Sequence, residues 1–322
     1  MKKDFETFYN ELDKSKLEGV WKEANLEKNK AKKRAFSVVT ILDLIILILF
    51  IVFVVPGIKG DLSSIMFYIF PLFFLFVIDI IIATFIMTFS KANKKHIEYN
   101  ALYKEWVIEN LLNNFYTEVD YIPNKEMPEN IYENVFDEGY DDYNSDDYTD
   151  ATINDKYRIS MANIHTTREE TYKDSDGNTR TRTVTVFSGM FGKIYIGKSI
   201  NNELRITENS IMRTKQKVNM DSQEFEKYFD VYSTNNIVTM QLLTHDVMSL
   251  LVDFRKIFKF PFEVVIKNNM LYVRLHVGAM FEGNINKNEI VDKKIVERYF
   301  NILDFINVLT KEIIKVVEET EV

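Results

Sequence analysis

Two long apolar segments constrain this chain more than any other feature. The first runs from Phe36 to Ile58 and the second from Ile65 to Phe89, and each contains one acidic and no basic residue. Either segment is long enough to cross the roughly 30 Å hydrocarbon core of a bilayer as a helix. Buried core helices are the alternative, but two such segments in tandem favour membrane insertion. About 35 mostly polar and charged residues precede the first segment, which argues against a signal peptide.

Basic residues set the expected orientation of these two segments. Close to the segments, five precede the first, three follow the second and one lies between them: Lys28, Lys30, Lys32, Lys33 and Arg34; Lys91, Lys94 and Lys95; Lys59. Because basic residues concentrate on the cytoplasmic side, both flanks are expected in the cytoplasm. The sequence therefore predicts a two-helix transmembrane hairpin over 36–89 in a cell membrane, with both termini cytoplasmic and the lipid bilayer as a partner.

Each predicted span contains one acidic residue, Asp43 or Asp79. Intramembrane acids are costly and are functional candidates by default. Their depths from the cytoplasmic side differ by only roughly 5 Å at 1.5 Å per residue, so the two can face one another. One interpretation is a proton- or cation-linked pair. The other, favoured because two spans alone make a poor transporter, is a hydrogen bond between protonated acids across the hairpin or an oligomer interface.

The spans are flanked by two amphipathic stretches. Residues 1–35 and 90–120 both carry apolar side chains at three- and four-residue spacing, which predicts helices that extend the hairpin into the cytosol. Binding of the first stretch along the membrane surface is the lesser alternative. Residues 121–155, with the run "DEGYDDYNSDDYTD", are expected to be an acidic loop or linker. Cation binding there is conceivable, but the run lacks the residue order of an EF-hand loop.

Strand-like patterns dominate after residue 156. "RISMANIHTTREETY" and "TRTRTVTVF" flank an Asp-Gly turn, "KSINN" separates two further strands, and Asn268-Asn269 is expected to close a hairpin. Asp221, with Glu224, and Thr244 are expected helix N-caps, and a long helix is expected over 288–319. Residues 156–322 therefore predict a cytosolic α+β domain with a mainly antiparallel sheet and flanking helices.

"GKIYIGKS" matches the phosphate-binding P-loop pattern at Gly192, Gly197, Lys198 and Ser199. With Asp253 as a Mg²⁺ ligand, it would support a membrane-bound nucleotide hydrolase. However, the residues between the glycines alternate as in a strand, and a turn and another strand are expected after Ser199, where a P-loop needs a helix. The two glycines are therefore expected to mark the ends of a strand, with Lys198 in a solvated turn.

Composition argues against several other classes of function. The formal net charge of -8 disfavours nucleic-acid binding. The absence of cysteine excludes disulfides, thiolate zinc sites and cysteine nucleophiles. The four histidines are scattered, and the His245-Asp246 pair is more typical of a helix start than of a general base. No catalytic residue, metal site or cofactor is expected.

Four segments carry a resemblance to a known group of proteins: "FSGMFGKI", "VNMDSQEFEKYFDVYS", "LLTHDVMSLL" and "NNMLYVRLHVG". Together with the two spans, they resemble a bacterial family of two-span membrane proteins with a cytosolic domain of unknown function. The resemblance implies no catalytic activity. It implies that F-x-G-x-F is a shared strand element, with structural roles for Gly189 and Gly192.

The sequence thus favours a non-enzymatic, membrane-anchored protein. Its cytosolic domain is expected to act as a scaffold or regulator that binds a protein partner or a second copy of itself. A nucleotide hydrolase using Lys198 and Ser199 is the alternative. Ion or proton handling by Asp43 and Asp79 is a third hypothesis.

Overall fold

The computed structural model describes residues 2–49, 51–52, 77–136, 138–208, 217–285 and 288–319. The chain divides into two compact units. One contains Met1–Glu11, Trp106–Glu282 and Lys294–Val322, and the other contains Leu12–Glu105 and Gly283–Lys293. We call them the sheet unit and the helical unit.

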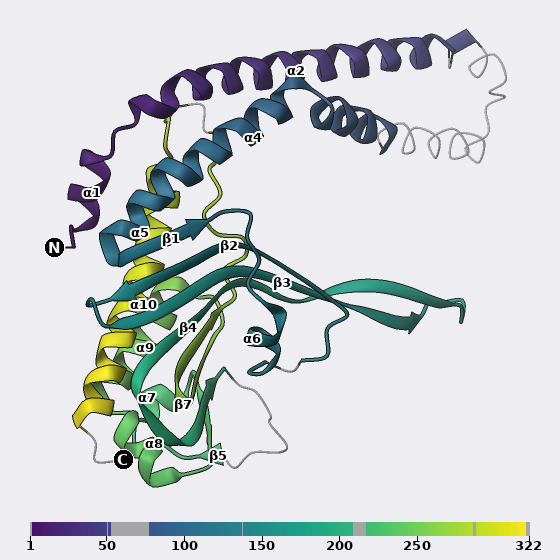
Figure 1. Ribbon diagram of the computed structural model, residues 1–322. Coiled ribbons are helices and arrows are strands. Elements are labelled where there is room, and N and C mark those ends of the chain that lie inside the picture. The colour runs from purple at the N-terminus through teal and green to yellow at the C-terminus, as the bar shows by residue number, and fades with distance from the viewer. Residues whose placement is uncertain are drawn as a thin grey trace. The chain divides into compact units, whose positions relative to one another are not determined.

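The helical unit is built on α2 (Ser15–Leu49) and α4 (Lys91–Tyr103), which pack against each other (Figure 1). Small side chains line the packed face of α2, where Ala24, Ala31 and Ala35 are buried. The α4 helix begins at Ser90, whose hydroxyl accepts a hydrogen bond from the backbone N–H of Ala92 at 3.2 Å. The α2 helix does not end near residue 35, because it runs unbroken into the first apolar segment.

No single helix among the described residues is both long and apolar enough to cross a bilayer. The helix Val77–Thr88 is apolar but shorter, and a pair bent by 69°, α8 (Asn236–Leu242) and α9 (His245–Phe258), meets the criteria together by length and composition. Residues 53–76, which contain the end of the first predicted span, the predicted connector and the first part of the second span, lie outside the described residues. The predicted hairpin is therefore not supported by a spanning helix in the part that the structure describes.

The sheet unit contains a seven-stranded antiparallel sheet. Its order is β1-β2-β3-β4-β6-β5, and β7 pairs with β4. The strands are β1 (Thr117–Ile122), β2 (Asp142–Ile153), β3 (Tyr157–Lys173), β4 (Thr179–Thr207), β5 (Lys217–Val218), β6 (Asp230–Ser233) and β7 (Phe262–Leu275). The helices besides α8 and α9 are α1 (Phe5–Glu11), α5 (Glu109–Phe115), α6 (Glu129–Glu133), α7 (Gln223–Glu226) and α10 (Lys293–Glu319), and a π-helical turn, η3 (Lys104–Ile108), precedes α5. The predicted α+β class with an antiparallel sheet is confirmed.

The predicted acidic loop over 121–155 is wrong. Residues 142–153 form β2, and the same interval contains the end of β1 and the short helix α6. Within β2, Asp142, Asn144 and Asp146 are exposed and alternate with the half-buried Tyr143 and Ser145. Several of the acids thus lie on a strand instead of in a loop, and the sheet begins at Thr117 instead of at residue 156.

Two predicted turns are instead bulges in long paired strands. The β4 strand continues through "KSINN", and β7 continues through Asn268-Asn269. The pairing of β4 with β7 shifts register between Tyr195 and Ile200, where Gly197 has φ of 86° and Asn268 has φ of 59°. A left-handed residue suits a turn and a bulge equally, so the local sequence does not distinguish them.

Helices cover both faces of the sheet (Figure 1). On one face, Tyr132 and Phe136 from the α6 region pack on Phe187 and Phe191 of β4. On the other face, Phe254 of α9 stacks on Phe305 of α10 at 3.5 Å between ring centroids, and both contact Phe262 of β7.

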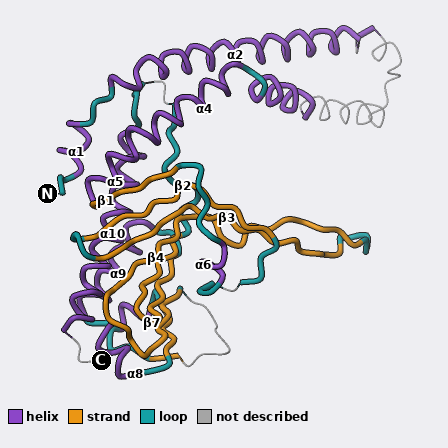
Figure 2. The backbone as a smooth tube through the Cα atoms, in the orientation of Figure 1, coloured by secondary structure: helices purple, strands orange, loops and turns teal. Residues whose placement is uncertain are grey.

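The ends of β3 and β4 extend beyond the sheet as a two-stranded arm (Figure 2). In this arm, Arg168–Lys173 pairs with Thr179–Val184. Its tip is the predicted Asp-Gly turn, with Gly177 at φ of 82°. The outer edges of the arm pair with no other strand among the described residues.

Candidate functional site

The P-loop-like segment lies inside β4. Gly192 pairs with Met161 of β3 on one side and with Val273 of β7 on the other. The chain after Ser199 continues as the same strand up to Thr207, and Asp253 lies on the exposed face of α9. A phosphate-binding loop needs free backbone N–H groups before a helix N-terminus. No helix follows this segment, so it lacks the helix N-terminus of a phosphate-binding loop, and the expected strand ends at Gly192 and Gly197 are wrong.

The glycines of F-x-G-x-F have different surroundings. A Cβ atom on Gly189 would lie 1.9 Å from the carbonyl oxygen of Leu275 and 2.9 Å from the backbone nitrogen of Val277. A Cβ on Gly192 would lie 3.7 Å from its nearest side chains, an ordinary contact. The structure therefore requires glycine at position 189 and not at position 192.

The segment "DSQEFEKYFDVYS" has local structural roles. Ser222, rather than the predicted Asp221, caps α7 by accepting a hydrogen bond from the N–H of Phe225 at 3.3 Å, whereas Thr244 caps α9 as expected. Phe225 and Phe229 are buried in the core. Ser233 at its end is buried and donates to the Asn202 side chain at 2.9 Å. These residues build the fold and form no reactive group.

A buried ionic network centred on Arg274 was not predicted from the sequence. Arg274 on β7 is 1 % exposed and donates to both carboxylate oxygens of Glu138, at 2.6 Å each. It also contacts Glu263, donates to the Tyr132 hydroxyl at 2.9 Å and lies 4.1 Å from the Phe136 ring centroid. A buried guanidinium is costly unless its charge is paired. Because Tyr132 and Phe136 are among the contacts of Arg274, the network holds the α6 region on the sheet.

Arg205 and His276 border the same network. Arg205 donates to the carbonyl of Val135 at 2.5 Å and lies 3.6 Å from Glu263. His276 packs edge-on against Phe187, with 4.9 Å between ring centroids. Burial and, secondarily, the nearby charge of Arg274 lower the pKa of His276 to about 4. His276 is therefore neutral near pH 7.

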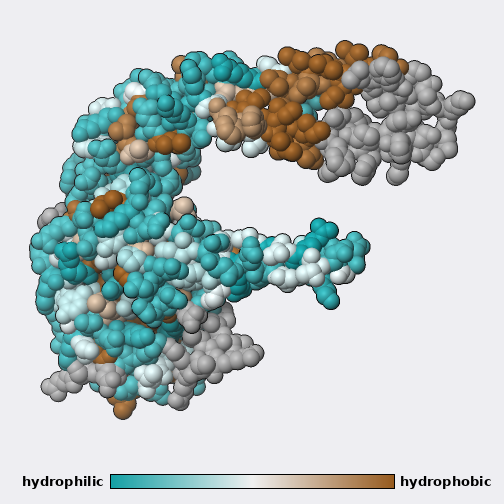
Figure 3. Space-filling view, turned by 45° about the vertical axis from the view of Figure 1, so that its right-hand side comes forward, coloured by the Kyte–Doolittle hydropathy of each residue, from teal (hydrophilic) through white to brown (hydrophobic). Residues whose placement is uncertain are grey.

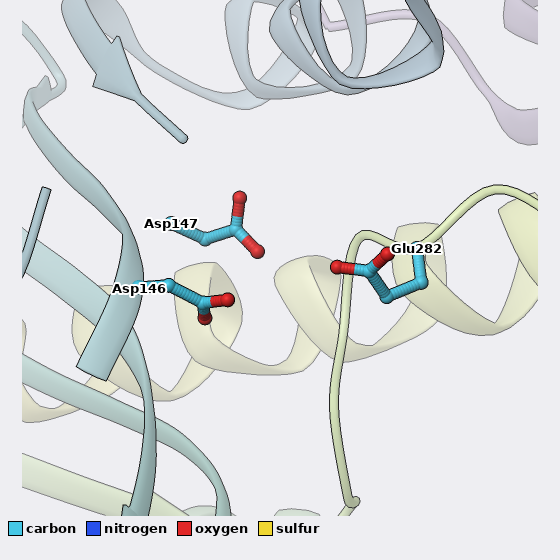
Figure 4. A group of neighbouring side chains, drawn as sticks. All are labelled: Asp146, Asp147 and Glu282. Carbon is cyan, nitrogen blue, oxygen red and sulfur yellow. The ribbon is translucent and has the colours of Figure 1, made fainter. Parts of the chain in front are cut away.

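A second group of charged side chains, three carboxylates, lies beside β2 (Figure 4). Asp146 and Asp147 come from β2 and Glu282 from the segment after β7, and one ligand atom of each lies within 4.8 Å of the others. Asp147 is fully buried and accepts hydrogen bonds from Tyr121 at 2.5 Å and from Asn163 at 2.8 Å. Burial, together with the charge of Asp147, raises the pKa of Tyr121. Among the described residues, these three could hold a hard cation.

Asp43 and Asp79 lie together in the helical unit. The side chains of Asp79 and Asp43 lie close enough for their carboxyl groups to interact. Asp43 lies on α2 and Asp79 on the helix Val77–Thr88, and their pairing within a membrane stays a prediction.

Large apolar side chains are exposed along both of these helices (Figure 3). On α2 the exposed fraction is 74 % for Phe36 and 58 % for Ile48, and on the second helix it is 60 % for Ile81 and 63 % for Phe85. We call this surface the apolar band; it also includes Val38, Ile41, Leu44, Ile45, Leu47, Ile51, Val52, Val77, Ile78, Ile80 and Phe89. It is far more apolar than the usual surface of a water-soluble domain.

Comparison with known proteins gives one family match. Residues 185–315 match the family described as "Protein of unknown function (DUF3137)". The DUF3137 match begins in β4 and ends in α10, so it lies within the region expected to be a domain of unknown function. No curated protein matches the chain.

Among solved structures, the chain is similar to the crystal structure of the mycobacterial trehalose monomycolate transport factor A, TtfA. The identity is 9 % and the TM-score 0.37, over 66 % of this chain and 94 % of that chain. A likeness at this level carries no argument about fold or function.

Proposed function

We propose that this protein is anchored in a cell membrane by a two-span hairpin, with both termini in the cytoplasm, and that its sheet unit binds a protein partner there. The apolar band is the observation that carries this proposal. A helix that exposes apolar side chains around its surface is stable when lipid replaces water, since each buried CH₂ group contributes about 0.8 kcal/mol.

The sequence outside the described residues supports the same arrangement. The apolar stretch of α2 continues to Ile58, and the apolar stretch of the second helix begins at Ile65. Completed in this way, each stretch has the length of a membrane span. The basic residues at both outer ends support a cytoplasmic position for the flanks.

The two-stranded arm supports partner binding. Among the described residues, neither outer edge of the arm pairs with a further strand, although the Glu169 N–H donates to the Asp141 carboxylate at 2.7 Å. Such edges readily pair with a strand of another chain. An isolated two-stranded ribbon is marginally stable in water. The arm is held by ion pairs among Arg168, Arg182 and Glu170 and by stacking of Arg182 over Tyr172. We assign the partner-binding surface to this arm.

Membrane anchoring is tested by vesicle flotation. Flotation of the full-length protein with neutral phosphatidylcholine vesicles, resistant to alkaline carbonate, is expected from membrane anchoring. Recovery of the protein in the soluble fraction would contradict anchoring.

Partner binding is tested by pull-down from a detergent extract. We expect a stoichiometric partner, or self-association, that is lost when residues 168–184 are replaced by Asn-Gly. A control variant with Thr→Ser changes at Thr171 and Thr181 keeps the arm and should keep the partner. Absence of any stoichiometric complex, or one unaffected by loss of the arm, would contradict the assignment.

A further inference from the structure

Five exposed cations lie where the apolar band meets the rest of the helix pair. They precede Phe36 on α2 or follow Phe89 on α4, and we call them the basic collar: Lys32, Lys33, Arg34, Lys91 and Lys94. Within the described residues, none of the five makes a direct ion pair with a carboxylate.

Cations farther from the apolar band behave differently. Lys22 pairs with Glu18 at 2.5 Å, and Lys30 pairs with Glu27 at 2.7 Å. Lys95 pairs with two carboxylates, Glu23 at 2.6 Å and Glu98 at 2.9 Å. Lys22, Lys30 and Lys95 thus each form a direct ion pair, whereas the cations beside the band form none among the described residues.

Collar residues from both helices lie near the carboxylate of Glu27. The pKa of Glu27 is lowered first by its hydrogen bond with Lys30 and then by the charges of Lys91 on α4 and Arg34 on α2. Lys91 and Lys94 of α4 also line one hollow together with Glu27 of α2. Both helices therefore contribute cations to the collar.

We propose that the basic collar binds the phosphate groups of anionic phospholipids. This inference rests on the proposed membrane anchoring, because it places the collar at the headgroup layer. The occupant follows from charge complementarity and from continuity with the apolar band, since a lipid offers acyl chains to the band and an anionic headgroup to the collar. Each basic residue at such a surface strengthens binding by about fivefold, equivalent to about 1 kcal/mol.

Native mass spectrometry of the full-length protein in mild detergent tests this proposal. Phosphatidylglycerol and phosphatidylcholine with identical acyl chains are added at equal concentration. We expect the protein to bind phosphatidylglycerol more than tenfold better. The variant R34Q/K91Q/K94Q should reduce this preference to within about twofold. The matched variant K22Q/K30Q/K95Q, which removes the paired lysines, should keep it.

Competition and flotation measurements separate the possible outcomes. Glycerol phosphate or inorganic phosphate should not displace the lipid, and displacement at equal concentration would identify a free-phosphate site and overturn the proposal. Equal binding of the two lipids by the unaltered protein would also overturn it. The collar variant should still float with neutral phosphatidylcholine vesicles. If the unaltered protein floats there without preferring phosphatidylglycerol, only the lipid inference fails, whereas failure to float refutes the anchoring on which it rests.

Discussion

At the scale of single residues, Gly189 is the position with the least freedom to change. Its missing side chain lets the carbonyl oxygen of Leu275 approach β4, where a Cβ atom would lie at 1.9 Å. The sequence indicated a structural glycine here but assigned the same importance to Gly192. The two glycines differ in their distance to residues that are far away in the sequence, and the local sequence pattern contains no information about these distances.

We predict that Gly189→Ala destabilises the protein by about 2–3 kcal/mol, because backbone atoms must move to admit the methyl group. Gly192→Ala should change stability by less than about 1 kcal/mol. Thermal unfolding of both variants in detergent measures the difference. Equal effects at the two positions would contradict this account of the glycines.

His276 makes stability depend on pH. Its pKa of about 4 in the folded state lies below the ordinary value of 6.5, so the unfolded chain binds more protons between these values. The contribution of His276 is complete above pH 6.5 and is lost as pH falls towards 4.

We expect the protein to lose about 1 kcal/mol more stability between pH 7 and pH 5.5 than a His276→Gln variant does. The measurement is the unfolding midpoint at both pH values, with substitution of the exposed His165 by Gln as the control. A His276→Gln variant with unchanged pH dependence would show that this histidine is not buried as the structure places it.

At the scale of elements, the local sequence identifies positions with left-handed backbone but does not show whether each lies in a turn or in a bulge. The Asp-Gly turn at Gly177 was predicted correctly because two strands of regular alternation flank it. Gly197 and Asn268 carry the same left-handed signal but lie in bulges of β4 and β7. Only the partner strand decides between a turn and a bulge, and the partner lies elsewhere in the sequence.

The strand β2 was missed because charge outweighed periodicity. Acids dominate its sequence, and charge runs are usually solvated loops. Arg158 of β3 pairs with Asp150 at 2.8 Å, which shows how the neighbouring strand compensates part of that charge. Alternation of residues such as Tyr143 with the acids was the signal that could have identified it.

The packing of α2 on α4 depends on small side chains. Ala31 is 3 % exposed at the packed face, and a larger residue there would push the helices apart. We predict that Ala31→Leu destabilises the pair by about 1–3 kcal/mol, whereas Asn29→Leu on the exposed face should have little effect. Hydrogen exchange over residues 91–103 is the readout. Equal protection in both variants would contradict this packing.

At the scale of the whole molecule, the class of fold was predictable but its buried polar contacts were not. Apolar segments, strand patterns and the closing helix follow from local periodicity. Arg274 and Glu138 are 136 positions apart, and the sequence around either residue does not predict their pairing. Helix geometry converts the sequence positions of Asp43 and Asp79 into depth, and their pairing within a membrane stays a prediction.

The central claim is the two-span hairpin with a cytoplasmic sheet unit, and cysteine accessibility tests it most directly. The chain has no cysteine, so a single introduced cysteine reports the accessibility of its own position. The two variants are Ser63→Cys in the connector and Asn178→Cys in the arm. In intact cells, a membrane-impermeant maleimide should label position 63 and not position 178. After permeabilisation it should label both. Equal labelling of the two positions in intact cells, or labelling of position 178 alone, would contradict the proposed topology.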